Sequence, residues 1–233
     1  MKRYFISICF AGLAISAALA QQKKTVPPPP KPADQEPSLA VTMKFIQSKM
    51  NDQGVVGYVF SQTNIPGVAF RTFYRFSDVT TDSSTCSLHK VETTNVRVEV
   101  TAGTTYSEGG KPVTGADLVR QLVETSTVSL KDVESIRVES QQDAVNRSFA
   151  QNGYPDISAT IEPTIFQLTL VASKPVFLFH VSQTVGKQPP VTSDTPLAKE
   201  DSLHFRDEDT ADRLAKALTH AIELCGGGNK DPF

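Results

Sequence analysis

Several features are scarce or missing in this sequence of 233 residues, and each absence narrows the possible functions. The chain has no tryptophan, so an aromatic platform for stacking sugars would have to be built from its five tyrosines and 13 phenylalanines. It also has no excess of basic residues, because 23 Lys and Arg stand against 25 Asp and Glu. Proteins that hold nucleic acid or an anionic membrane surface need a basic surface, so the composition argues against both functions.

Long apolar runs are also missing, except for one stretch at the N-terminus that has the features of a secretory signal peptide. A basic start is followed by an uncharged apolar run that ends in the small-residue pattern Ala-Leu-Ala at Ala20. We therefore predict that residues 1–20 are a signal peptide, cleaved between Ala20 and Gln21, and that the protein is periplasmic or secreted. A membrane helix needs roughly 20 apolar residues, and this run is shorter, so we predict no transmembrane anchor.

Cysteine is rare, and cleavage would reduce its number from three to two. Cys9 lies within the predicted signal peptide, which leaves Cys86 and Cys225 in the mature chain. In an oxidising compartment this pair predicts one disulfide, and the alternative is two buried free thiols. A bridge requires the two Cα atoms to lie within about 7 Å of each other. Loss of the two basic residues of the signal peptide would leave 21 Lys and Arg against 25 acidic residues, a net charge of −4.

Composition divides the mature chain into three parts. Residues 21–37 contain five prolines within Pro27–Pro32 and nothing that could enter a core, so we predict a disordered Pro-rich linker that acts as a spacer. Residues 38–228 are predicted to form a single globular domain, since about 190 residues is an ordinary domain size. Residues 229–233 are predicted to be a disordered tail.

Hydrophobic periodicity predicts a helix at each end of this domain. A helix over residues 39–52 is predicted by the apolar residues that share one helical face, which are Leu39, Met43, Ile46 and Met50. A second, amphipathic helix is predicted near the C-terminus, where apolar residues recur with helical spacing from Ala211 to Cys225. Acidic residues precede this stripe and three glycines follow it, as expected for the two ends of a helix. Cys225 lies on the apolar stripe, within reach of a strand partner such as Cys86.

Alternating apolar residues between the helices predict about seven antiparallel strands. The predicted strands are 55–62, 68–76, 86–91, 95–101, 132–139, 156–172 and 176–185, with a further short strand at 202–205. The strand 86–91 carries Cys86, Leu88 and Lys90 on one face. The segments between the strands are predicted as a turn at 78–84, a flexible hairpin tip at 102–116, a short helix at 118–123, a polar loop at 140–156 and a second loop at 186–199.

The closing segment reads LHFRDEDTADRLAKALTHAIELCGG, from Leu203 to Gly227. It resembles the terminal strand and helix of uncharacterised bacterial exported proteins that close a pleckstrin-homology-like barrel. The resemblance implies an α+β fold: a strongly bent antiparallel sheet or pleckstrin-homology-like barrel of about seven strands, with an N-terminal helix and a C-terminal amphipathic helix. It implies no activity and transfers no functional residue.

Motifs of the common enzyme classes are missing. No histidine has a partner at helical metal-ligand spacing, and there is no Cys-x-x-Cys and no Gly-x-Ser-x-Gly. The Gly-Lys loop at 108–115 lacks the first glycine of a phosphate-binding loop. His89, His180 and His204 lie in predicted strands and could converge, but the simpler interpretation is ordinary strand-face histidines. The sequence therefore predicts no catalytic, cofactor-binding or metal-binding residue, although folding could still assemble a triad.

Three functions stay open, and the first is preferred because it requires least. The first is a non-catalytic binding module for a protein or envelope component. The second is a carrier of a lipid or hydrophobic ligand, which would need unfilled volume inside the barrel. The third is an enzyme with a site built from strand ends and loops, which would need a concave pocket that holds a residue with a strongly shifted pKa.

Overall fold

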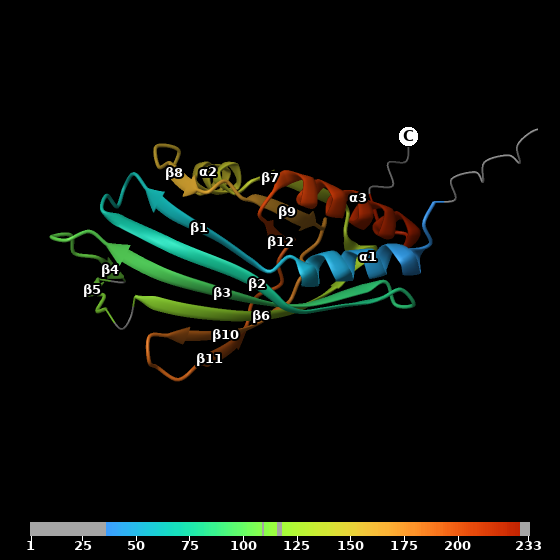
Figure 1. The fold of residues 1–233 in the computed structure, drawn as a ribbon, viewed down its shortest axis with the longest axis horizontal. Coiled ribbons are helices and arrows are strands. Elements are labelled where there is room, and N and C mark those ends of the chain that lie inside the picture. The colour runs from blue at the N-terminus through green and yellow to red at the C-terminus, as the bar shows by residue number, and fades with distance from the viewer. Residues whose placement is uncertain (1–35, 109, 116–117, 229–233) are drawn as a thin grey trace, which may run out of the picture. The chain divides into compact units, whose positions relative to one another are not determined.

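The computed structural model describes residues 36–108, 110–115 and 118–228, which hold three α-helices and two main antiparallel sheets (Figure 1). The described residues from Pro37 onward belong to one compact unit. Within these ranges, no helix is both long enough and apolar enough to cross a membrane.

Several predictions about the two ends of the chain fall outside the described residues. They are the signal peptide at 1–20, its cleavage between Ala20 and Gln21, nearly all of the linker at 21–37 and the tail at 229–233. These remain predictions.

The larger sheet has seven strands in the order β11-β10-β6-β3-β2-β1-β8, and all neighbouring strands are antiparallel. Its strands are β1 (Val55–Gln62), β2 (Val68–Asp82), β3 (Ser87–Val100), β6 (Val119–Ser129), β8 (Ala159–Glu162), β10 (Phe179–Val185) and β11 (Val191–Asp194). The consecutive pairing of β1, β2 and β3 is the meander that their alternating apolar residues predict. Among the described residues, β11 and β8 are the two edges of this sheet, so closure into a barrel is not shown.

The smaller sheet and the helices cover part of the larger sheet. The smaller sheet has the order β12-β9-β7, with β7 at Ser135–Ser140, β9 at Phe166–Val171 and β12 at Glu200–Phe205. The helices are α1 (Leu39–Asp52), α2 (Gln141–Gln151) and α3 (Glu208–Leu224), and the minor elements are β4 (Ser107–Glu108), β5 (Lys111–Pro112) and the 3-10 turn η1 (Leu130–Asp132). Helices α1 and α3 lie side by side; α3 packs on the smaller sheet and α1 on β2, whereas α2 lies next to β8 (Figure 1). The two predicted terminal helices are confirmed, and so is the α+β class.

The core lies between the two sheets and helices α1 and α3. The apolar stripe of α3 is buried as predicted, at Ala211, Leu214, Leu218, Ala221 and Ile222. Each leucine or isoleucine buried in this way stabilises the fold by about 1.5–3 kcal/mol. Asp207 caps the start of α3, because its carboxylate accepts a hydrogen bond of 2.8 Å from the backbone N–H of Thr210.

The predicted turn at 78–84 is wrong, because β2 continues to Asp82. A bulge between Phe76 and Asp78 shifts the register, and pairing with β3 then resumes. The turn itself begins at Ser83, and the Asp82 carboxylate closes it by accepting hydrogen bonds from Ser84. Serine and threonine are typical of turns, but in this segment they occupy the paired end of a long strand.

The two predicted strands 86–91 and 95–101 are one strand, β3. Polar residues interrupt the apolar pattern between the two segments, and such an interruption predicts the end of a strand. Glu92 and Thr94 nevertheless alternate with their neighbours as in any strand, and both line a cavity on the inner face of the sheet.

Four other segments also differ from the prediction. The predicted helix at 118–123 is part of β6, where pairing with β3 and β10 on either side overrides local propensity. The predicted loop at 140–156 contains α2, whose first turn is capped by Ser140 accepting a hydrogen bond from the Asp143 N–H. The strand predicted at 156–172 is divided into β8 and β9 around Pro163, which cannot donate to a ladder. The predicted loop at 186–199 contains the edge strand β11.

Candidate functional site

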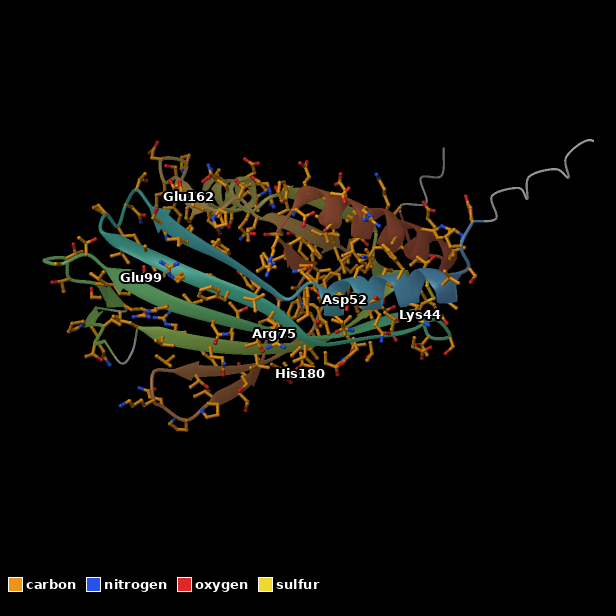
Figure 2. The ribbon with its side chains drawn as sticks, in the orientation of Figure 1. Lys44, Asp52, Arg75, Glu99, Glu162 and His180 are labelled. Atoms are coloured by element: carbon orange, nitrogen blue, oxygen red, sulfur yellow. A yellow bond between two sulfur atoms is a disulfide. The ribbon has the colours of Figure 1, made fainter. Side chains whose placement is uncertain are left out.

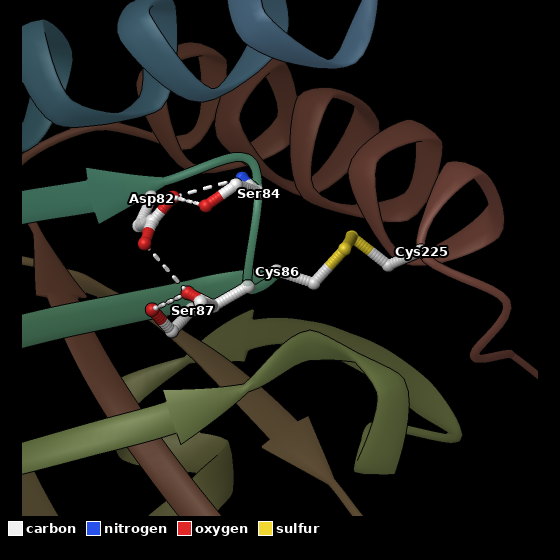
Figure 3. Close-up of a disulfide and its surroundings, with 6 residues drawn as sticks. Asp82, Ser84, Cys86, Ser87 and Cys225 are labelled. Carbon is white, nitrogen blue, oxygen red and sulfur yellow. Dashed lines mark hydrogen bonds between the residues drawn. A yellow bond between two sulfur atoms is a disulfide. The ribbon is translucent and has the colours of Figure 1, made fainter.

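The structure contains the predicted disulfide between Cys86 and Cys225 (Figure 3). The two Cα atoms are 5.8 Å apart, within the range that a bridge allows. Cys86 lies in the turn between β2 and β3, and Cys225 caps the C-terminal end of α3. The bond therefore fastens the last helix to one end of the larger sheet, and the alternative of two free thiols is wrong.

The three strand histidines do not converge on one site. His180 is exposed beside Asp194 at the β10–β11 edge, and the His89 ring contacts Thr127 across the outer face of the sheet, with 3.0 Å between Nδ1 and Oγ1. Only His204 is buried. In the part of the chain that the structure describes, no group of three His, Cys, Asp or Glu side chains is placed to hold a metal ion.

Sequence reasoning missed a cluster of charges centred on Lys90, a lysine of β3 whose side chain is 0% exposed. Its ammonium Nζ lies 3.0 Å from Asp201 Oδ1, 3.3 Å from Glu124 Oε1 and 3.5 Å from Glu92 Oε2. By contrast, Lys44 and Arg75 have exposed side chains at the surface (Figure 2). A buried ammonium is tolerated only when it is paired and hydrogen-bonded, and here three carboxylates meet that need.

Strand register explains how these side chains meet. Alternate residues of β3 point to the same face of the sheet, so Lys90 and Glu92 share the inner face. Glu92 is paired directly with Glu124 of β6, and two carboxylates facing each other across neighbouring strands repel. The Lys90 ammonium contacts both and removes that penalty. Asp201 approaches from β12, so the cluster links the larger sheet to the smaller one.

Charge interactions and burial oppose each other at Lys90 and Glu92. Burial acts to lower the pKa of Lys90, but the carboxylates, with Asp201 foremost, outweigh it and raise that pKa above its ordinary value. Burial acts to raise the pKa of Glu92, but the interaction with His204 and the charge of Lys90 outweigh it and lower that pKa. Lys90 is therefore held as an ammonium ion and Glu92 as a carboxylate.

Asp201 behaves in the opposite way. Burial raises the pKa of Asp201 to about 6 from an ordinary 3.8, although Lys90 acts to lower it. Its side chain is only 2% exposed, and the charges of Glu124 and Glu92 raise the pKa further. Asp201 is thus the member of the cluster whose charge changes near neutral pH.

An aromatic pair forms one side of the cluster. The ring of His204 stacks on the ring of Tyr74, with centroids 3.8 Å apart and planes 5° from parallel. The Tyr74 hydroxyl lies 3.3 Å from the hydroxyl of Tyr58, and burial raises the pKa of both tyrosines. His204 Nδ1 is 3.5 Å from Glu92 Oε1, close enough for an ion pair but without the geometry of a hydrogen bond. The stack fixes the orientation of the imidazole.

A cavity of about 290 Å³ opens beside this cluster. Its lining residues come from β2, β3, β6, β10 and β12, and they are Tyr74, Glu92, Thr94, Leu122, Glu124, Phe179, Glu200, Asp201, Ser202 and His204. Four of these ten residues are acidic, none is lysine or arginine, and one is the histidine His204. Lys90 lies behind the wall, with its ammonium 5.7 Å from the centre of the Phe179 ring.

Three polar atoms in the cavity wall are buried and have no hydrogen-bond partner among the described residues. They are Glu92 Oε1, Asp201 Oδ2 and His204 Nδ1. A buried polar atom left without a partner costs about 1–3 kcal/mol, and more when it carries charge. Native proteins keep such groups where a ligand or ordered water completes them. The sequence carried one signal for this site, since it placed Lys90 on the same strand face as Cys86 and Leu88.

Comparison with known proteins gave no match: no family model, no curated protein sequence and no solved structure is significantly similar to this chain.

The charge state of Asp201 gives a testable pH dependence. A carboxyl whose pKa is higher in the folded than in the unfolded chain adds stability below its unfolded pKa, and this contribution is lost as pH rises through the folded pKa. We therefore expect wild type to lose about 2 kcal/mol of stability relative to Asp201→Asn between pH 4 and pH 7. Urea unfolding followed by circular dichroism at a series of pH values measures this difference.

The opposite slope would contradict this prediction. If the pairing with Lys90 outweighed burial, the pKa of Asp201 would be lowered, and wild type would gain stability relative to Asp201→Asn as pH rises. A difference that does not change with pH would also be inconsistent with a pKa of about 6.

Proposed function

We propose that this chain is an exported, non-catalytic binding module of the periplasm or the extracellular medium, and that the cavity beside Lys90 is its recognition site. Export is supported by the signal peptide predicted at 1–20 and by the Cys86–Cys225 disulfide, since structural disulfides belong to oxidising compartments. The ligand is a small molecule or a side chain of a protein or envelope component. The resemblance to pleckstrin-homology-like barrels agrees with a binding role but stays a proposal.

One observation carries this proposal: buried polar atoms without partners lie together on the wall of one cavity. Asp201 Oδ2 and Glu92 Oε1 belong to side chains that are 2% and 5% exposed. Each side chain has its other oxygen committed to Lys90, and Glu92 Oε1 also lies 3.5 Å from His204 Nδ1, so both oxygens are held in fixed positions. Fixed polar groups on the wall of a pocket give the pocket its orientation and specificity.

The same geometry argues for binding over nucleophilic catalysis. Three carboxylates keep Lys90 protonated, and a protonated amine is not a nucleophile.

The core between the two sheets and helices α1 and α3 is filled by apolar side chains. The hypothesis of a hydrophobic-ligand carrier therefore gains no support.

A substitution that fills the cavity tests the proposed function. Thr94 lines the cavity, and we expect Thr94→Phe to abolish binding of any small molecule that wild type binds there. Thr93→Phe is the matched control, because it makes the same change at the next residue, on the opposite face of β3. Screening a library of small polar fragments by ligand-observed NMR against the three proteins provides the measurement.

Two results of this screen would contradict the proposal. One is that no fragment binds wild type, which would leave ordered water as the partner of the buried atoms. The other is that Thr94→Phe and Thr93→Phe bind the fragments equally, which would place the binding elsewhere on the surface. Circular dichroism and the melting temperature of each variant show whether it is folded.

A second candidate function, an acid–base enzyme that uses the same cavity, is favoured by one observation. The pKa of Asp201 lies at about 6, where a carboxyl group can both accept and release a proton near neutral pH. The test is to incubate each bound fragment with wild type and with Asp201→Asn and to follow it by NMR. New product signals with wild type alone would favour the enzyme, whereas an unchanged ligand favours the binding module.

A further inference from the structure

We propose that the cavity beside Lys90 recognises an organic cation: a primary ammonium group, or a guanidinium group, carried on an apolar stem. This inference rests on the proposed function and specifies the chemistry of the ligand. Three features of the cavity support it: the negative charge of its wall, the buried carboxylate oxygens that make no hydrogen bond, and the apolar side chains around them.

The electrostatic balance of the cavity favours a cation. Glu92, Glu124 and Asp201 surround the single ammonium of Lys90, and the other basic group beside them is His204, whose Nδ1 lies 3.5 Å from Glu92, so acidic groups outnumber basic groups here. Glu200 also lines the cavity, but the guanidinium of Arg137 compensates it at 3.1 Å. An anion placed here would meet like charges where little water screens them, and would be repelled.

The unpaired atoms define the position of the charged group. Lys90 uses one oxygen of Asp201 and one of Glu92. The second oxygen of Asp201 is buried without a partner among the described residues, and that of Glu92 has no hydrogen bond but lies 3.5 Å from His204 Nδ1. A carboxylate oxygen accepts hydrogen bonds and does not donate them, so Asp201 Oδ2 lacks a donor, which a ligand can supply. An ammonium or guanidinium supplies several N–H donors together with the missing positive charge, and charge-assisted hydrogen bonds are the stronger kind.

The remaining walls suit an apolar stem of limited size. Phe179 and Leu122 present apolar surface, and the aromatic rings of Tyr74 and His204, stacked on each other, also line the cavity. Aromatic faces also attract cations. A volume of about 290 Å³ corresponds to roughly ten water molecules at about 30 Å³ each, which accommodates a short alkyl chain with its charged end.

Three probes that differ mainly in their polar end test the inference with wild-type protein. They are n-butylamine, 1-butanol and butanoate, titrated at pH 7 and low salt while backbone amide shifts of the cavity strands are followed by NMR. We expect butylammonium to bind at least about tenfold more tightly than the alcohol, and butanoate to bind least, because only the ammonium satisfies the carboxylates. This comparison needs no variant.

Variants locate the binding. We expect Asp201→Asn to weaken butylammonium binding by about tenfold or more, because it removes the negative charge of the carboxylate whose second oxygen has no partner among the described residues. Glu99→Gln is the matched control, since it removes one carboxylate at the surface (Figure 2), where Glu99 pairs with Arg71, and it should change binding less than about twofold. Thr94→Phe should abolish binding.

The outcomes separate this inference from the proposed function. If 1-butanol or butanoate binds as tightly as butylammonium, and Thr94→Phe abolishes that binding, the site is a binding site but the cation inference is wrong. If butylammonium binding resists both Thr94→Phe and Asp201→Asn, the inference is wrong as well. If wild type binds neither these probes nor any fragment of the library, both proposals fail.

A final pair of probes distinguishes the two sources of such a cation. Cadaverine represents a free small amine. Nα-acetyl-lysine methylamide, whose side-chain ammonium is unmodified, represents a lysine side chain of a protein or peptide. Tighter binding of the lysine derivative would assign the site to a protein partner, and tighter binding of cadaverine to a small molecule. Binding of either one supports the cation inference, whereas binding of neither contradicts it.

Discussion

Replacing Lys90 with methionine is expected to destabilise the protein by about 3–5 kcal/mol at pH 7. The substitution keeps most of the side-chain volume but removes the ammonium that contacts Glu92, Glu124 and Asp201. Removing one partner from a buried ion cluster leaves the others without compensation in a poorly solvated site, and this is the expensive step. Urea unfolding followed by circular dichroism measures the change.

The exposed Lys44 provides the control for this substitution. Lys44→Met removes a surface charge on α1, and such changes are usually within about 0.5 kcal/mol. A destabilisation of Lys90→Met no larger than that of Lys44→Met would contradict the structural role given to the cluster. Adding Asp201→Asn and Glu92→Gln to Lys90→Met should restore part of the stability, because neutral amides need no buried counter-charge.

The Lys90→Met variant should also acquire a characteristic pH dependence. Without the ammonium, burial and mutual repulsion raise the pKa values of the cluster carboxylates in the folded state, as burial already does for Asp201. A group whose pKa is raised by folding adds stability at low pH and loses it as pH rises. The variant should therefore recover part of its stability between pH 7 and pH 5, and a constant deficit over this range would contradict the explanation.

Removing the disulfide is expected to have an effect of similar size, about 5 kcal/mol. Cys86 and Cys225 are 139 residues apart in the sequence, and a bridge across so long a loop strongly restricts the unfolded chain. The comparison is between wild type and Cys86→Ala/Cys225→Ala, each unfolded in urea with and without dithiothreitol. Reductant should lower the stability of wild type to near that of the double variant and should leave the double variant unchanged.

The backbone of Cys86 adds a refinement to this experiment. Its φ is 58°, in the left-handed region that glycine adopts easily and alanine does not. Cys86→Gly/Cys225→Ala should therefore be more stable than Cys86→Ala/Cys225→Ala by about 1 kcal/mol. A wild-type stability that reductant changes by less than about 1 kcal/mol would contradict the larger prediction.

The disulfide and the Lys90 cluster each link the larger sheet to an element packed against it, α3 and β12 respectively. The disulfide joins the end of α3 to the turn between β2 and β3, and the Lys90 cluster joins β3 and β6 to β12. The cavity is lined by strands of the larger sheet and by β12 of the smaller sheet. Its shape therefore depends on how the two sheets are held together. Loss of either link is expected to weaken ligand binding through the fold as well as through direct contact.

The sequence alone determined the features that depend on local periodicity. Helix α1 and most of α3 were predicted because their apolar residues recur with the helical period. The first strands were predicted for the same reason with a period of two. The disulfide was predicted by counting, since the predicted cleavage would leave two cysteines and Cys225 lies on a buried stripe. Each inference needed only near neighbours in the chain.

Only the tertiary structure decided the features that depend on pairing between distant segments. The unbroken course of β3 was missed because Glu92 and Thr94 are polar where the alternating pattern requires apolar residues, yet these side chains face a cavity and a buried lysine. Similarly, β6 is a strand because β3 and β10 pair with it on both sides. Lys90 on an apolar face was visible in the sequence. Its partners Glu124 and Asp201 lie in strands far from it in the chain, and sequence periodicity does not say which strands meet. The compensation of a buried charge is a property of the folded arrangement, so the candidate site became evident only there.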